Sequence, residues 1–285
     1  MTEEIAVHEV NLFQNQLTRA NHSIATVRAY MADVRQFLAF LKDMSRLPWA
    51  CTRNTLDQFM TELRAKGFTD SSIRRKISSI AAFLDVFVGQ GTMSLNPTNG
   101  LTRPVVVSHP RATVTDEDVA RMILNIDDSH VLGSRDRAMV SVLYTTGIKD
   151  YELLGLNISD VKFNESGQDT IIVKGKQGER VVNISKDVAS CIRNYLLFRY
   201  QNALPGDERQ RLFINKSGKP INSRSVRRKI EIYRQKAGIL SPVTPSMFRN
   251  TCVSNMFRSG GNGEEVKKYF GYKLTTKVEP EPVAV

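Results

Sequence analysis

The sequence predicts a mainly α-helical protein of two domains, the second of which is α+β with a small β-hairpin. Three observations predict this. Apolar residues recur at helical spacing through most of the 285 residues. Segment 95–112 contains three prolines and separates two such stretches. Two short β-branched runs flank a glycine-containing turn. We therefore expect domains at 1–94 and 113–278, joined by that linker, and a disordered tail at 279–285.

The first domain is predicted to consist of four helices. They are expected at 7–17, 26–38, 52–66 and 73–88. Ser23 precedes the second helix, Gly67 ends the third, and Asp70-Ser-Ser72 caps the fourth. The predicted inward positions of the second and fourth helices are Val27, Tyr30, Val34, Phe37, Leu38, Ile73, Ile77, Ile80, Phe83 and Leu84.

The second domain begins with a helix whose first turn is acidic. Its opening residues are Thr115-Asp-Glu-Asp118, and acids are favourable at the positive end of a helix. Another helix is expected at 135–146. Strands at 169–173 and 180–184 then enclose a turn at Lys174–Glu179. Further helices are predicted at 186–203, 223–237, 247–259 and 263–270.

Composition excludes several classes of protein. No run of eighteen apolar residues exists, so we expect no membrane span. The acidic start, Met1–Ile5, does not resemble a secretory signal, and three scattered cysteines predict reduced thiols in the cytoplasm rather than a metal site. The net charge of +11 favours a polyanionic partner, the alternative being a basic protein that binds none.

Three motifs carry a family resemblance. Thr244–Thr251 reads T-P-S-M-F-R-N-T, and Tyr269–Tyr272 follows as Y-F-G-Y. Thr146–Leu156 reads T-G-I-K-D-Y-E-L-L-G-L. Together with the spacing of Thr26, Tyr30, Asp33 and Phe37, these segments resemble the Xer-like tyrosine recombinases, or phage-type integrases. Members of that family carry T-P-H-x-L-R-H-T, L-G-H and T-G-x-R-x-x-E-L.

The resemblance implies a fold, a partner and a reaction. The fold is a SAM-like core-binding domain followed by a tyrosine recombinase catalytic domain, which form a C-shaped clamp around double-stranded DNA. A tyrosine hydroxyl attacks a phosphodiester, and no cofactor or metal is needed. Expected partners on DNA are a second copy of the chain or a paralogous recombinase, and no membrane is involved.

The family's catalytic positions map onto this chain one by one. Lys149 stands in place of the first arginine, and Arg249 is the second. The hairpin lysine corresponds to Lys176, with Lys174 as competitor. Ser246 stands at a position where the family has His. Tyr272 stands at a position where the family has His or Trp. Glu279 occupies the position of the nucleophile in the motif T-T-x-x-Y, after Thr275 and Thr276.

Each of these residues also has a plain structural interpretation. The alternative interpretation of Lys149 is a surface lysine at a helix end. The alternative for Lys176 is a solvated lysine in a turn. Arg249 reads as an arginine that caps neighbouring groups, and Tyr272 as a half-buried packing aromatic. Ser246 donates hydrogen bonds but is not a base near neutral pH.

Two basic clusters are candidate DNA contacts. Each lies near one end of an amphipathic helix, and the alternative is a solvated charged face. The candidate residues are Arg28, Arg74, Arg75 and Lys76 in the first domain and Arg224, Arg227, Arg228 and Lys229 in the second.

The sequence thus predicts a DNA-binding member of a DNA integration and recombination family, impaired or inactive in strand cleavage. An accessory factor or a remnant of a mobile element fits this description. One alternative is an active recombinase that uses Tyr269 or Tyr272, or a tyrosine donated in trans by a partner subunit. Another is a protein-interaction scaffold that shares only the ancestry of the family.

Overall fold

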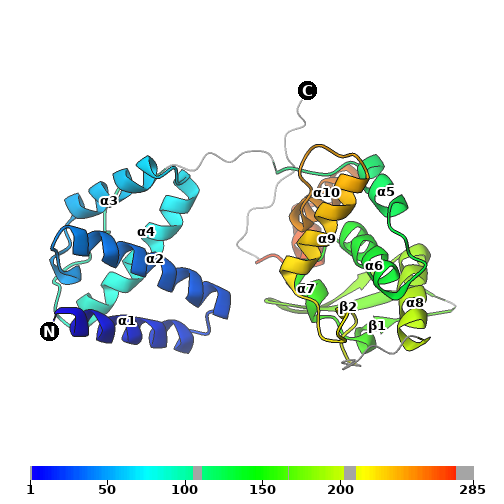
Figure 1. Ribbon diagram of the computed structural model, residues 1–285, viewed down its shortest axis with the longest axis horizontal. Helices are drawn as coiled ribbons and strands as arrows, with labels where there is room; N and C mark the ends of the chain where they lie inside the picture. The colour runs from blue at the N-terminus through cyan, green and yellow to red at the C-terminus, as the bar shows by residue number, and fades with distance from the viewer. Residues whose placement is uncertain (1, 105–110, 166, 202–209, 274–285) are drawn as a thin grey trace. The chain divides into compact units, whose positions relative to one another are not determined.

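A computed structural model describes residues 2–104, 111–165, 167–201 and 210–273. The chain divides into two compact units, Met1–Ser108 and His109–Val285. The predicted fold class is confirmed: both units are mainly helical, and the second contains a small antiparallel sheet (Figure 1). Within these described ranges, no helix is long and apolar enough to cross a membrane.

The first unit is a bundle of four α-helices in which α4 contacts the other three. The helices are α1 (Thr2–Arg19), α2 (Ile24–Asp43), α3 (Arg53–Ala65) and α4 (Asp70–Gly89), with a 3₁₀ turn η1 (Pro48–Ala50). Phenylalanine rings fill the centre. The ring centroids of Phe13 and Phe83 lie 5.5 Å apart, and those of Phe37 and Phe59 lie 5.2 Å apart.

Local capping sets the helix ends of this bundle. Ser23 is the N-cap of α2, and its hydroxyl accepts from the Thr26 N–H at 3.1 Å. Gly67 adopts a left-handed φ of +79°, which ends α3 as expected. The predicted cap of α4 is wrong by one residue, because Thr69 is the N-cap and its hydroxyl accepts from the Ser72 N–H.

The second unit surrounds a central helix, α6 (Figure 1). This helix contacts α5, α7, α8 and α10. The helices are α5 (Asp116–Leu124), α6 (Val131–Thr146), α7 (Asp150–Gly155), α8 (Lys186–Gln201), α9 (Ser223–Lys236), α10 (Pro245–Arg258) and α11 (Gly263–Phe270), with a 3₁₀ turn η2 (Ile158–Asp160). A core of aliphatic side chains from α6, the sheet and α8 lies between these elements.

The sheet has three antiparallel strands in the order β1-β2-β3. They are β1 (Val161–Lys162), β2 (Thr170–Gly175) and β3 (Gly178–Asn183). The predicted hairpin is confirmed, but its turn is only two residues, Lys176 and Gln177, because Gly175 pairs with Gly178. Lys174 therefore lies in the strand and not in the turn. The short elements β1 and α7 have no counterpart in the sequence prediction.

Candidate functional site

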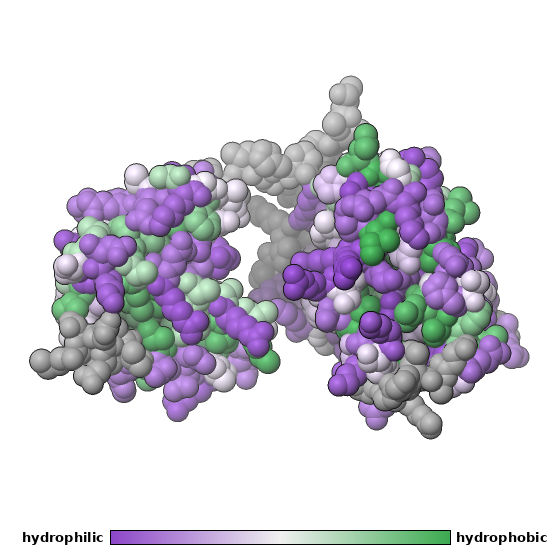
Figure 2. Space-filling view, viewed as in Figure 1, coloured by the Kyte–Doolittle hydropathy of each residue, from purple (hydrophilic) through white to green (hydrophobic). Residues whose placement is uncertain are grey.

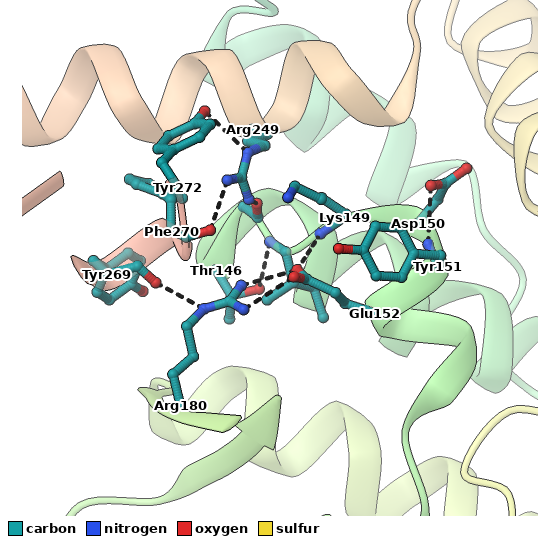
Figure 3. A network of polar contacts seen from close by, with 12 residues as sticks. Thr146, Lys149, Asp150, Tyr151, Glu152, Arg180, Arg249, Tyr269, Phe270 and Tyr272 are labelled. Carbon is teal, nitrogen blue, oxygen red and sulfur yellow. Dashed lines mark hydrogen bonds and ion pairs between the residues drawn. The ribbon is translucent and has the colours of Figure 1, made fainter. Parts of the chain in front are cut away.

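The site is built around a buried arginine on α10. Arg249 is 6% exposed, and three of its N–H groups donate to the protein. Nη1 donates to the Gly147 carbonyl at 2.8 Å and Nη2 to the Phe270 carbonyl at 2.7 Å, while Nε donates to the Tyr272 hydroxyl at 3.1 Å (Figure 3). A guanidinium has five N–H donors, so two of them have no hydrogen-bond partner among the described residues.

The N-terminus of α7 brings a second cation to Arg249. Lys149 precedes α7 and is half-buried. Burial, and then the positive charge of Arg249, lowers the pKa of the Lys149 ammonium below its usual value. Because the two residues lie 100 positions apart in the sequence, only the fold brings their charges together. Two clustered cations of this kind attract an anion.

A surface depression of about 310 Å³ lies between these elements. Residues at the start of α7, in α9 and at the N-terminus of α10 line it. The positive end of the α10 dipole favours anions. The lining residues are Ile148, Lys149, Asp150, Arg227, Thr244, Pro245, Ser246 and Arg249. Ser246 thus lies beside Lys149 and Arg249, and its hydroxyl is 3.0 Å from that of Thr244.

A salt bridge behind the depression fixes the position of Lys149. The Glu152 carboxylate accepts from the Lys149 backbone N–H at 2.8 Å and from both Nη atoms of Arg180, at 3.0 and 2.8 Å (Figure 3). Burial alone would raise the pKa of Glu152, but these hydrogen bonds lower it, so Glu152 stays charged. Arg180 Nε also donates to the Tyr269 carbonyl at 2.8 Å, which ties β3 to α11.

Arg180 and Glu152 have roles in the site that the sequence prediction did not assign. A signal for Arg180 exists in the sequence. Strand alternation places it on the same face as the buried Val182, and an inward-facing charge needs a partner. Glu152, on α7, stands at the E of the motif T-G-x-R-x-x-E-L, but no local pattern pairs it with Arg180.

The two hairpin lysines differ in their surroundings. Lys174 Nζ lies 3.2 Å from an Asp160 carboxylate oxygen and is therefore ion-paired. Lys176 is exposed at the turn, close enough to Lys149 for its charge to contribute to the lowered pKa of Lys149. This placement favours Lys176 over Lys174 as the hairpin residue of the site.

Tyr272 lies against the guanidinium of Arg249, whose Cζ is 4.5 Å from the ring centroid. Tyr269 lies in the last turn of α11, and burial raises the pKa of its hydroxyl. Thr275, Thr276 and Glu279 lie outside the described residues. The structure therefore brings together Lys149, Ser246, Arg249 and Tyr272, with Lys176 at the edge.

The basic cluster of the first unit differs from its prediction at one residue. Lys76 is 7% exposed, and its ammonium donates to Asp33 at 2.9 Å and to Gln36 at 2.7 Å. The burial and ion pairing of Lys76 disfavour it as the DNA contact that the sequence analysis named. Arg75 also pairs with Asp33, although its side chain is half-exposed. The remaining candidates, Arg28 and Arg74, are exposed.

The basic cluster on α9 is partly paired. Arg227 Nη2 lies 3.2 Å from Asp150, and Lys229 Nζ lies 2.9 Å from the buried Asp136. Arg224 and Arg228 are exposed. The visible surface over α9 is mostly hydrophilic (Figure 2).

Comparison with known families identifies both units. The model of the phage integrase family matches residues 113–279. The model of the phage integrase N-terminal SAM-like domain matches residues 10–91.

Comparison with individual proteins agrees with these matches. Tyrosine recombinase XerC of Salmonella typhi is 28% identical over 274 residues, which cover 95% of this chain and 89% of that one. Tyrosine recombinase XerC of Escherichia coli O157:H7 is 29% identical over 248 residues, covering 87% and 81%.

Two solved structures show the same fold. The post-cleavage complex of XerH with palindromic difH substrate has a TM-score of 0.74 at 17% identity and covers 91% of this chain and 78% of that one. A lambda integrase(75-356) dimer bound to a COC′ core site has a TM-score of 0.70 at 14% identity, covering 97% and 98%.

Proposed function

This chain belongs to the phage integrase family, and from that premise we propose that it binds double-stranded DNA but is impaired in strand cleavage. The observation that carries the proposal is the depression in which Lys149 and Arg249 meet. It offers positive charge and unused N–H donors, which suit a backbone phosphate. The solved relatives XerH and lambda integrase are bound to DNA in their structures.

Charge outside the depression supports DNA binding. Affinity for duplex DNA comes largely from the neutralisation of phosphates by Lys and Arg. The net charge of +11 provides this in excess, and the exposed side chains of Arg28, Arg74, Arg224 and Arg228 are available for it. We also propose that the protein is cytoplasmic and that it acts in DNA integration or recombination.

Impaired cleavage is supported by the residues that occupy the catalytic positions of the family. Lys149 keeps the charge of an arginine but lacks its two-pronged fork. Ser246 does not transfer protons near neutral pH. Glu279, at the position of the nucleophile, carries a charge that phosphate oxygens repel. Such residues act as a unit, so several replacements together remove nearly all cleavage.

A second candidate function is cleavage by a tyrosine at an unusual position. One observation favours Tyr272, because its hydroxyl lies 3.1 Å from Nε of Arg249 and thus beside the proposed phosphate site. Tyr269 has less support, because its backbone carbonyl is tied to Arg180 and burial raises the pKa of its hydroxyl. A tyrosine donated by a partner subunit is the third route.

Gel-shift titration with a duplex oligonucleotide at several salt concentrations tests the binding proposal. We expect log K to fall with log salt by about 0.9 for every phosphate contacted. Arg249→Ala should weaken binding, while Arg258→Ala, an exposed arginine on the same helix, should change it little. Failure of the unmodified chain to shift duplex DNA at low salt would refute the proposal.

A further inference from the structure

The depression contains a third cationic side chain, which comes from α9. Arg227 lines it together with Lys149 and Arg249, although each residue belongs to a different part of the sequence. Its neighbours Arg224 and Arg228 do not line the depression. Arg227 is therefore distinguished from the other arginines of α9 by position rather than by charge.

We propose that Arg227 supplies the guanidinium fork for a phosphate group in this depression, in place of the fork that Lys149 lacks. The proposal rests on the proposed function, because the phosphate is taken to be that of the DNA backbone. Lysine acts on a phosphate as a point charge, whereas arginine donates two parallel hydrogen bonds to it. With Arg249 and Arg227 together, the site regains two guanidinium groups.

Arg227 is held at the depression by a contact that leaves most of its N–H donors available to a ligand. Its Nη2 atom lies 3.2 Å from Oδ2 of Asp150, and its side chain is 67% exposed. Among the residues that the structure describes, this contact with Asp150 occupies one of the five N–H donors of Arg227. Arg249, in contrast, is 6% exposed and has three contacts with the protein. The buried arginine is fixed in advance, and the exposed one is free to close on a ligand.

Asp150 lines the same depression, and its negative charge opposes a phosphate unless it is compensated. Hydrogen bonds to both carboxylate oxygens of Asp150 provide this compensation. Oδ2 accepts from the Ser223 hydroxyl at 2.5 Å and from Arg227, and Oδ1 accepts from the Tyr151 N–H at 2.9 Å. Burial alone would raise the pKa of Asp150, but these contacts lower it. Asp150 therefore acts as the tether that places Arg227 beside Lys149.

Inorganic phosphate is a direct probe of this arrangement. Thermal unfolding of the full chain is followed while phosphate replaces chloride at constant ionic strength, and the rise in the midpoint gives the affinity. We expect Arg227→Ala to lower the phosphate affinity about fivefold, as for a loss of about 1 kcal/mol. Arg227→Lys should restore only part of it, because the charge returns without the fork.

Arg228→Ala is the matched control, because Arg228 is the next residue on α9 and is exposed outside the depression. It should change the phosphate affinity less than twofold. Midpoints measured in chloride alone show whether each variant is folded. Equal losses for Arg227→Ala and Arg228→Ala, full rescue by Arg227→Lys, or no phosphate effect on the unmodified chain would each overturn the proposal.

Failure of this inference is distinguishable from failure of the proposed function. If the unmodified chain still shifts duplex DNA but the phosphate series shows no special effect of Arg227, only the role of Arg227 falls. If the chain shifts no duplex DNA, the proposed function is refuted. The inference about Arg227 is then refuted too, because it takes a DNA phosphate as the ligand.

Discussion

Arg249 and Tyr272 hold each other in two ways: Nε of the arginine donates to the tyrosine hydroxyl at 3.1 Å, and the guanidinium carbon lies 4.5 Å from the ring centroid. Together with the Gly147 and Phe270 carbonyls, this contact fixes the guanidinium before any ligand arrives. A fixed donor group binds a phosphate without a further ordering cost. The tyrosine thus positions the arginine.

Tyr272→Phe should weaken DNA binding modestly and lower the free energy of unfolding by about 1 kcal/mol, because a buried N–H loses its acceptor. Tyr272→Ala should cost more, since the ring is lost as well. Gel shift and urea unfolding measure the two effects. Tyr200→Phe, at an exposed tyrosine of α8, is the control and should change neither. Unchanged binding in both Tyr272 variants would contradict the positioning role.

Gly147→Ala should destabilise the second unit by about 1–3 kcal/mol. Gly147 has a left-handed φ of +60°, and an added Cβ would lie 2.7 Å from Phe270 Cε1. Because the Gly147 carbonyl accepts from Arg249, DNA affinity should fall too. The measurements are thermal unfolding and gel shift. Gly89→Ala, where nothing lies within 4 Å, should be neutral or stabilising; a similar loss there would refute the reason given.

Phosphate binding should be coupled to proton uptake at alkaline pH. Burial and Arg249 lower the pKa of Lys149 below 10.5, and a bound phosphate raises it again. Between the two values, binding takes up a proton, so DNA affinity falls as pH rises through this window. Calorimetry in buffers of different ionisation enthalpy counts the protons. Lys149→Arg, which does not titrate, should abolish the uptake; persistence of the uptake would assign it elsewhere.

The same shift has a consequence for the stability of the free protein. In the window between the lowered pKa of Lys149 and 10.5, the unfolded chain binds more protons than the folded one. The contribution of this group to stability therefore rises with pH there. Lys149→Arg should remove that rise in urea unfolding curves measured across the window.

Asp33→Asn should destabilise the first unit by about 3–5 kcal/mol. The buried Asp33 carboxylate accepts from Arg75, Lys76 and Ser79, and without its charge the Lys76 ammonium is buried unpaired. Hydrogen exchange should speed up in α2 and α4 and stay unchanged in α6. Asp43→Asn, at an exposed acid of α2, is the control. Unchanged exchange in α4 would contradict this account.

Most of the fold was predictable because its signals are local. Helix ends follow from caps such as Ser23 and Thr115, whose hydroxyls accept N–H groups three residues on. The short elements were not predictable. Helix α7 has six residues, too few to show a period, and β1 has two residues that form a strand only by pairing with β2.

Lys76 illustrates why a charge cluster in sequence is not a cluster in space. Residues 74–76 are consecutive, but helical spacing places Lys76 on the inner side with Ile73 and Ile80. Its partner, Asp33, comes from another helix. The sequence pattern of α4 alone does not indicate that Lys76 pairs with Asp33.

Some residues of the site were predictable from sequence motifs, and others were not. Lys149 and Arg249 were found through motifs whose spacing resembles that of a family, and the structure places them together. Arg227 was predicted only as one of four candidate DNA contacts near one end of a helix. Its place in the depression depends on the packing of α9 against α7, which no local pattern encodes.

Covalent trapping on DNA separates binding without strand cleavage from cleavage by a tyrosine. Duplexes recovered from a random pool by binding to the chain are nicked to make suicide substrates, incubated with it and run on native and denaturing gels. We expect a retarded complex on the native gel that dissociates completely in detergent. A detergent-resistant species linked through a tyrosine would contradict this expectation.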